Sequence, residues 1–338
     1  MAIRSKYSLL KRIVRSGLLA LAAVIVVFVL WMSLPRLWSS LSPGKPPAGY
    51  FFTPATYAAV WLGVEKLMDL GPEIPENIEE FRDIEYKNIN GRSLQLDIYR
   101  DKNSPGPAPL IAFIHGGSWR SGKRSDYLPY LIGLARKGYV TATVSYRLLR
   151  DAPYPACVED IADAVIWFHS NGDQYGYDTS RMALAGGSAG AHLALLAAYG
   201  WKPAVLHDTI PGQKTRGKIK AVADIYGPVD LTTEYARNHR LVTSFLNSSW
   251  DENPDIFREA SPVSYIDGND PPTLIFHGTS DRLVPVSQSD RFRELLDSAG
   301  VPCVYHRIPG WPHTMDIVQR VNIYCQEKMN DFFLQYLK

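Results

Sequence analysis

From about residue 81 onward, short uninterrupted apolar runs alternate with stretches of helical periodicity, and this alternation constrains the fold most. Strands that are buried on both faces read as continuous apolar runs, and βα alternation implies a mainly parallel sheet with helices on both faces. The predicted strands are Leu110–Ile114, Val140–Tyr146, Met182–Ala185, Ile219–Tyr226, Thr273–His277 and Cys303–Arg307. Helices are predicted around residues 127–137, 158–169, 189–199, 287–299 and 317–337.

Two departures from this rhythm are informative. The alternating segments Asp83–Ile89 and Leu94–Tyr99 are separated by Asn90-Gly91, which is a strong signal for a tight hairpin turn. This antiparallel hairpin at one edge makes the predicted sheet mixed. The long interval Leu231–Asp267 is aromatic and charged, and we expect it to be an excursion beside the active site.

The N-terminus differs from the rest of the chain. Five Lys and Arg residues among the first fifteen precede an apolar run, Gly17–Leu34, which has the minimum length for a transmembrane helix. By the positive-inside rule the N-terminus is cytoplasmic and the catalytic body lies on the extracytoplasmic side. The alternative is a cleaved secretory signal and a secreted body; the length of the run favours an uncleaved anchor.

We expect three regions: residues 1–41 as cytoplasmic stub and anchor, 42–80 as linker and amphipathic helix, and 81–338 as catalytic domain. Apolar residues from Tyr57 to Met68 fall at helical spacing. The favoured interpretation is a helix that packs this stripe on the domain. The alternative is a helix that rests on the membrane or covers a substrate pocket.

Composition argues against two classes of function. The formal net charge is only +2, and no basic stripe with interleaved aromatics is present, which gives nucleic-acid binding little support. The three cysteines have no CxxC spacing, so no metal or redox motif is predicted, and we expect all three to be small buried residues. No metal or organic cofactor is expected.

A catalytic motif stands at Gly186–Gly190, which reads G-x-S-x-G between a predicted strand and a predicted helix. In that context glycines remove side chains that would collide on a sharp turn, and the hydroxyl of Ser188 is pushed into the open. The helix N-terminus behind it favours a developing negative charge. Ser188 is therefore the predicted nucleophile.

A second glycine motif, His115–Trp119, follows the strand Leu110–Ile114. A tetrahedral intermediate needs backbone N–H donors aimed at its oxygen, and glycines let the backbone approach. We assign the oxyanion hole to Gly117 and Ala189, with Gly116 and Ser118 as neighbours. His115 is expected to anchor the loop.

The serine needs a base, and the base needs an acid. His313 lies in a loop after the last strand, at the sheet edge where α/β catalytic groups gather, and we take it as the base. Asp281 follows the strand Thr273–His277 at the same edge and is the predicted acid. Asp230 is the runner-up acid, and its other interpretation is a turn residue. His192 is expected to be a packing histidine.

These motifs resemble the α/β-hydrolase superfamily, over about the last three quarters of the chain. Within it they are similar to esterases with an HGG motif: hormone-sensitive-lipase-like, acetyl- and feruloyl-type, and kynurenine formamidase-like enzymes. Gly187 stands where hormone-sensitive-lipase-like members usually carry Asp, and a membrane segment is not usual in these soluble enzymes.

The resemblance implies a serine carboxylesterase that works through an acyl-enzyme on Ser188, with a small-molecule or lipid ester as substrate and a membrane reached through the N-terminal helix. Amidase, formamidase or peptidase action would use the same triad. The alternative that is not an enzyme is a non-catalytic binding module on a hydrolase scaffold.

Overall fold

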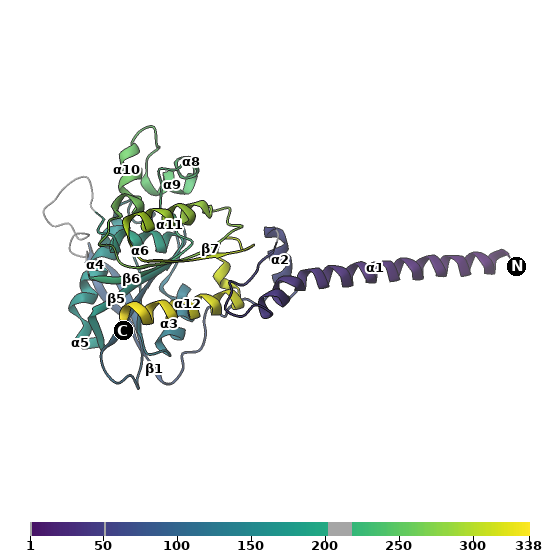
Figure 1. Ribbon diagram of the computed structural model, residues 1–338, viewed down its shortest axis with the longest axis horizontal. Coiled ribbons are helices and arrows are strands. Elements are labelled where there is room, and N and C mark those ends of the chain that lie inside the picture. Colours follow the sequence, from purple (N-terminus) through teal and green to yellow (C-terminus); the bar gives the residue numbers. More distant parts are fainter. Residues whose placement is uncertain (1, 51, 202–217) are drawn as a thin grey trace.

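The computed structural model describes residues 2–50, 52–201 and 218–338. These residues form an α/β-hydrolase-like body around a sheet of eight strands in the order β1-β2-β4-β3-β5-β6-β7-β8 (Figure 1). The strands are β1 (Ile78–Ile89), β2 (Arg92–Asp101), β3 (Ala108–Ile114), β4 (Val140–Val144), β5 (Tyr177–Gly187), β6 (Ile219–Ile225), β7 (Thr273–Gly278) and β8 (Cys303–Ile308). β1 and β2 pair antiparallel, β2 pairs antiparallel with β4, and the other neighbours are parallel. The predicted mixed, mainly parallel sheet is confirmed.

The hairpin turn forms as the sequence predicts. Asn90 and Gly91 both adopt positive φ, at 51° and 82°, which the twist of a two-residue hairpin requires. Ile89 and Arg92 then face each other as the first pair of the β1–β2 ladder.

Helices cover both faces of the sheet, as βα alternation predicts. α3 (Leu128–Ala135) and α12 (Gln319–Leu337) pack on one face, and α4 (Ala156–Ser170), α6 (Ala189–Ala198) and α11 (Ser287–Ala299) pack on the other. The remaining elements are α1 (Ala2–Ser40), α2 (Thr53–Trp61), α5 (Gly172–Tyr175), α8 (Glu234–Arg237), α9 (Arg240–Leu246), α10 (Pro254–Glu259) and the 3-10 turns η1 (Arg124–Tyr127), η2 (Pro262–Tyr265) and η3 (Met315–Ile317).

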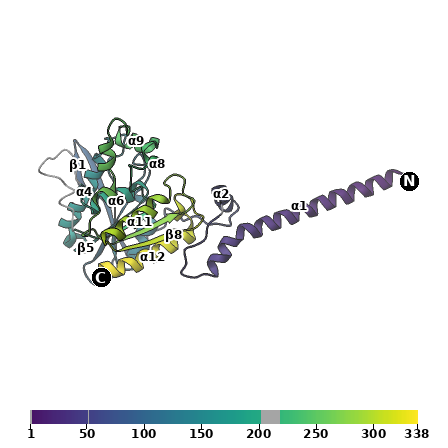
Figure 2. The same ribbon diagram turned by 45° about the horizontal axis from the view of Figure 1, so that its top comes forward.

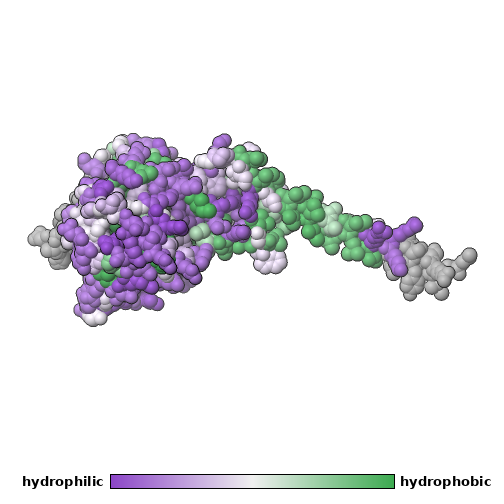
Figure 3. Space-filling model, turned by 90° about the horizontal axis from the view of Figure 1, so that it is seen from below, coloured by the Kyte–Doolittle hydropathy of each residue, from purple (hydrophilic) through white to green (hydrophobic). Residues whose placement is uncertain are grey.

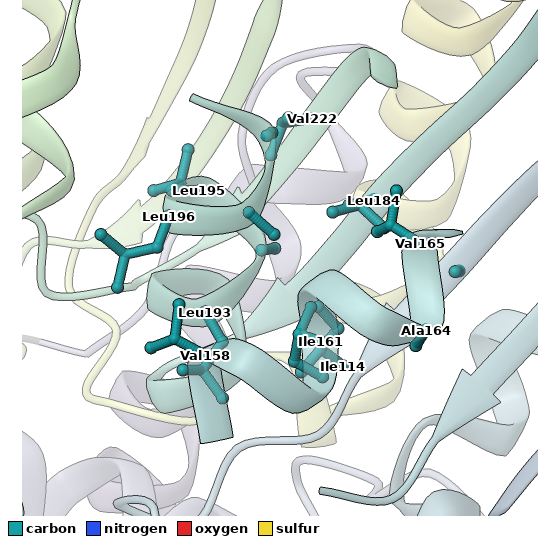
Figure 4. Close-up of a cluster of buried hydrophobic side chains, with 14 of the residues drawn as sticks. Ile114, Val158, Ile161, Ala164, Val165, Leu184, Leu193, Leu195, Leu196 and Val222 are labelled. Carbon is teal, nitrogen blue, oxygen red and sulfur yellow. The ribbon is translucent and has the colours of Figure 1, made fainter. Parts of the chain in front are cut away.

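The core on the α4 and α6 side is made of aliphatic side chains from neighbouring helices and strands. Ile161 and Val165 of α4, Leu193 of α6 and Leu184 of β5 belong to one buried cluster, and all four are at most 2% exposed (Figure 4). Burial of such side chains contributes roughly 1.5–3 kcal/mol each. This packing holds β5 and α6, the two elements that flank Ser188, in a fixed relation.

The interval Leu231–Asp267 forms α8, α9, α10 and η2, and Figure 1 shows α8, α9 and α10 together at the top of the body. Tyr235, His239 and Val242 from this interval line a small cavity that Ser188 also lines. The predicted excursion beside the active site is confirmed.

α1 is the helix that contains the apolar run. Its part Lys11–Ser40 is, among the described residues, the one helix long and apolar enough to cross a membrane. Figure 3 shows a hydrophobic surface along the part of this helix that lies between its hydrophilic outer end and the body.

The prediction of one helix from Tyr57 to Met68 is wrong in two respects. α2 ends at Trp61, because Gly63 adopts φ +72° and closes the helix, a role that glycine fills without strain. The stripe also packs on the domain only in part: Val60 and Val64 lie half-buried against the core, whereas Tyr57 and Trp61 are exposed. The fully buried residues of α2 are instead Ala55, Thr56 and Ala59.

The Pro- and Gly-rich segment after α1 is packed rather than free. The amide of Gly49 donates to the carbonyl of Pro309 (2.7 Å), and the amide of Tyr50 donates to that of Gly310 (3.1 Å). A Cβ atom on Gly49 would lie 2.6 Å from the carbonyl carbon of Gly310, so only glycine permits this approach. The segment therefore lies directly against the loop that carries His313.

Candidate active site

Ser188 occupies the turn between β5 and α6. Its φ of 55° and ψ of −124° place a non-glycine residue in a strained region, which persists only where the surrounding packing holds it. The glycines around it permit close packing. A Cβ atom on Gly116 would lie 2.7 Å from the carbonyl oxygen of Gly187, so the loop after β3 sits directly against the serine turn. The side chain of Ser188 thus points out of the sheet edge beside that loop.

Three predicted residues meet at this edge. The hydroxyl of Ser188 donates to Nε2 of His313 over 3.0 Å, and Nδ1 of His313 donates to Oδ2 of Asp281 over 2.6 Å. The short second bond is typical of a charge-assisted pair, and it fixes the imidazole in the tautomer whose Nε2 can accept a proton. The order from hydroxyl to imidazole to carboxylate is one that can activate a serine.

Asp281 is held as an anion. Its Oδ1 accepts the amides of Leu283 and Val284, both at 2.9 Å. Burial alone would raise the pKa of Asp281, but hydrogen bonds from His277 and His313 outweigh it and lower the pKa to about 2. The carboxylate therefore stays ionised at neutral pH.

The residues predicted for the oxyanion hole lie around the same hydroxyl. Gly116, Gly117 and Ser118 line the cavity that Ser188 and His313 line. Gly117 adopts φ +102°, a conformation that glycine takes without strain. Ala189 is the first residue of α6, where helix amides have no partner within the helix. Amides from two sides thus flank the serine.

The other histidines and acids have structural surroundings. His192 is fully buried, accepts from Trp119 Nε1 (3.3 Å) and contacts the carbonyl of Ala260 with Nε2 (2.7 Å). His115 is buried beneath Tyr146, with ring centroids 4.3 Å apart. Asp230 accepts from the amide and hydroxyl of Thr232, which is the turn role named as its alternative.

A group of residues that the sequence did not indicate lies behind His313. The Tyr226 ring is 4.7 Å from the imidazole, and its hydroxyl donates to Asp316. Tyr130 donates to the same carboxylate (3.3 Å), and burial raises the pKa of Asp316. The sequence signal that could have indicated Tyr226 is its position directly after β6, because β6 ends at the same sheet edge as the strands before Ser188 and Asp281.

Two cavities meet at Ser188. The larger, of about 300 Å³, is lined by His313 and has a polar side that includes Asp126, Tyr226 and Asp316. The smaller, of about 20 Å³, is bounded by Trp119 and Val242. Trp119 stacks on Phe245 with ring centroids 4.1 Å apart, so the wall of the small cavity is rigid.

Comparisons with known proteins show the family of the chain. The BD-FAE family model matches residues 96–296, more than half of the chain. The chain belongs to the BD-FAE family of α/β-hydrolase esterases. The matched range contains Ser188 and Asp281 and ends before His313.

Relatives of this BD-FAE member include esterase LipQ of Mycobacterium tuberculosis, 34% identical over 72% of this chain and 59% of LipQ. Esterase LipC of the same organism is 33% identical over 66% of this chain and 57% of LipC. The chain thus spans less than two thirds of these curated relatives.

Solved structures show the same fold. A carbohydrate esterase from gut microbiota has a TM-score of 0.67 and 24% identity over 76% of this chain and 95% of that one. Thermogutta terrifontis esterase 2 with propionate bound has a TM-score of 0.64 and 25% identity over 78% and 96%.

Proposed function

We propose that this protein is a membrane-anchored serine carboxylesterase with Ser188 as nucleophile, His313 as base and Asp281 as acid. The observation that carries the proposal is the line of hydrogen bonds from Ser188 Oγ through His313 to Asp281, at 3.0 and 2.6 Å. Membership of an esterase family supports it. A non-catalytic module would have no need of this constellation.

The reaction proceeds in two acyl transfers. His313 takes the proton of Ser188 as Oγ attacks the ester carbonyl carbon, and the amides of Gly117 and Ala189 hold the oxyanion. His313 then gives the proton to the leaving alcohol, and the acyl group stays on Ser188. Water attacks the acyl-enzyme with His313 again as base, which releases the carboxylic acid and restores the hydroxyl.

The reaction indicates which part of the ester each of the two cavities holds. The leaving alcohol must lie within reach of His313, because His313 protonates it. His313 lines the large cavity and not the small one, so the alcohol occupies the large cavity and the acyl group the small one. A volume of about 20 Å³ holds little more than one water-sized group, which suits an acetyl methyl. We therefore assign short-acyl esters as the substrate class.

Amide or peptide hydrolysis by the same triad is the second candidate. The relatives named above are esterases, which favours the ester. For localisation we propose that α1 spans the membrane uncleaved, with its basic N-terminal end in the cytoplasm and the body, with its active site, on the other side.

A chain-length series of p-nitrophenyl esters tests the proposal, with Ser188→Ala as control. The proposal predicts fastest turnover of the acetate and loss of turnover in the variant. Wild-type turnover by the Ser188→Ala variant would remove Ser188 from the role of nucleophile. Parallel assays with p-nitroacetanilide decide between ester and amide.

A further inference from the structure

The short helix α2 presents its residues in an unusual way. Small side chains, Ala55 and Ala59, face the protein and are 4% and 0% exposed, whereas the large Tyr57 and Trp61 are 65% and 85% exposed. The helix carries no charged residue. An outward face of this kind is unfavourable in water and is typical of a surface that contacts a membrane or a partner.

The position of α2 is fixed relative to α1. The ring of Phe52, which precedes α2, lies 6.2 Å from that of Trp31, inside the apolar run of α1. Arg36 of α1 donates to the carbonyl of Val64 over 2.8 Å and holds the turn that follows α2. Figures 1 and 2 both show α2 beside the end of α1 that joins the body. If α1 spans a bilayer, α2 lies at its surface.

The chain after α2 leads to the active site. The amide of Met68 donates to the carbonyl of Ile317, and that of Gln319 to the carbonyl of Lys66, both at 2.8 Å. This pairing places the exposed side chains of Leu70 and Ile317 on the rim of the large cavity, which also contains Ser188 and His313. Exposed apolar residues therefore run from α1 to the cavity. We call this set the entrance patch: Phe52, Tyr57, Trp61, Leu62, Leu67, Leu70 and Ile317.

We infer that the entrance patch lies in the interfacial layer of the bilayer that holds α1, and that the ester substrate reaches Ser188 from that layer. The inference rests on the proposed function, since it needs α1 in a membrane. The substrate class is then a short-acyl ester of an amphipathic alcohol dissolved in the bilayer. Its tail stays among the side chains of the patch, and polar atoms near the ester face Asp126, Asp316 and Asn322, which also line the cavity.

Two observations favour a bilayer over a protein partner as the occupant. The patch is continuous with a helix that is itself apolar enough to span a membrane, and Tyr and Trp are the side chains enriched at that depth. The exposed Lys66 directly precedes Leu67 of the patch in the chain, and lysine at this level is attracted to lipid phosphates.

The experiment uses the full chain in phosphatidylcholine vesicles and two acetates, water-soluble p-nitrophenyl acetate and bilayer-dissolved hexadecyl acetate. Tyr57→Ser with Trp61→Ser removes the two large exposed side chains of α2, and neither lines the cavity. We expect turnover of hexadecyl acetate to fall about tenfold, since interfacial binding scales with buried apolar area, and that of p-nitrophenyl acetate to stay unchanged. Val304→Ser, an exposed apolar residue of β8, is the matched control and should change neither rate.

Unchanged turnover of both esters, or an equal loss on both, would overturn the inference. A second readout is independent of activity. A fluorophore attached through Trp61→Cys should be quenched by lipids labelled near the headgroup, and one attached through Val304→Cys should not. Absence of quenching in the Trp61→Cys variant would also overturn the inference. If the wild type hydrolyses neither ester, the proposed function fails, and the quenching result still tests the position of the patch.

Discussion

Arg320 holds the carboxylate of Glu65, donating from Nη2 to Oε1 over 2.8 Å and from Nε to Oε2 over 2.9 Å. Glu65 follows α2, and Arg320 lies in the first turn of α12, so the pair joins segments 255 residues apart. The guanidinium also lies over the ring of Trp311, 4.8 Å from its centroid, two residues before His313. The N-terminal segment is thereby tied to the loop of the base.

From this pair we predict that Arg320→Met destabilises the protein by about 3–5 kcal/mol, because the buried carboxylate of Glu65 loses its cationic partner and keeps the neutral Tyr50 hydroxyl as a donor. The Glu65→Gln, Arg320→Met double variant should recover part of that loss. Chemical denaturation monitored by tryptophan fluorescence measures both. Equal stability of Arg320→Met and wild type would show that the pair contributes nothing.

For the acid of the triad, Asp281→Asn should lower kcat on p-nitrophenyl acetate by about 10³–10⁴-fold, since the imidazole loses the partner that fixes its tautomer. Asp230→Asn is the matched control, and we expect its kcat to lie within about threefold of wild type, because the Asp230 carboxylate accepts local turn hydrogen bonds from Thr232. The reverse result would move the acid to Asp230.

The small cavity should set acyl selectivity. Val242→Ala removes two methyl groups from its wall and should raise the ratio of hexanoate to acetate turnover by about tenfold. Val165→Ala makes the same change in the core beneath α4, away from the site, and should leave that ratio unaltered. An unchanged ratio in Val242→Ala would place the acyl group elsewhere.

Asp224 should make stability depend on pH. Burial raises its pKa to about 7, and among the described residues its Oδ2 has no hydrogen-bond partner. The folded state therefore binds a proton that the unfolded state releases near pH 4, so stability falls as pH rises from about 4 to 7. The free energy of unfolding of Asp224→Asn, relative to that of wild type, should therefore be higher at pH 8 than at pH 4.5, by at most about 4 kcal/mol.

Thermal unfolding of Asp224→Asn and wild type at the two pH values measures this difference. Asp173→Asn, an exposed aspartate of α5, should show no such dependence. A pH-independent difference for Asp224→Asn would indicate that Asp224 is already neutral or well solvated at both values.

The sequence predicted the sheet because its strands are continuous apolar runs that only a two-sided core explains. It placed Ser188, Asp281 and His313 at one sheet edge, since each follows a strand in a mainly parallel sheet. The helical spacing beyond Trp61 gave a wrong prediction, because the helix ends at the turn of Gly63 and Leu67 pairs instead with Val318 in an isolated antiparallel bridge.

Features that depend on long-range contact had no sequence signal. Glu65 and Arg320 each read as an ordinary surface charge, and only the fold brings them together. The same holds for Tyr226 and Asp316 behind His313. The outward direction of Tyr57 was also hidden, because periodicity shows that a stripe exists and not which way it faces.

Labelling with a fluorophosphonate, followed by mass spectrometry of the adduct, tests the central claim most directly. The account predicts one phosphonylated residue, Ser188, and a labelling rate that falls strongly in His313→Ala. Failure of the wild type to react, or an adduct on a serine other than Ser188, would contradict it.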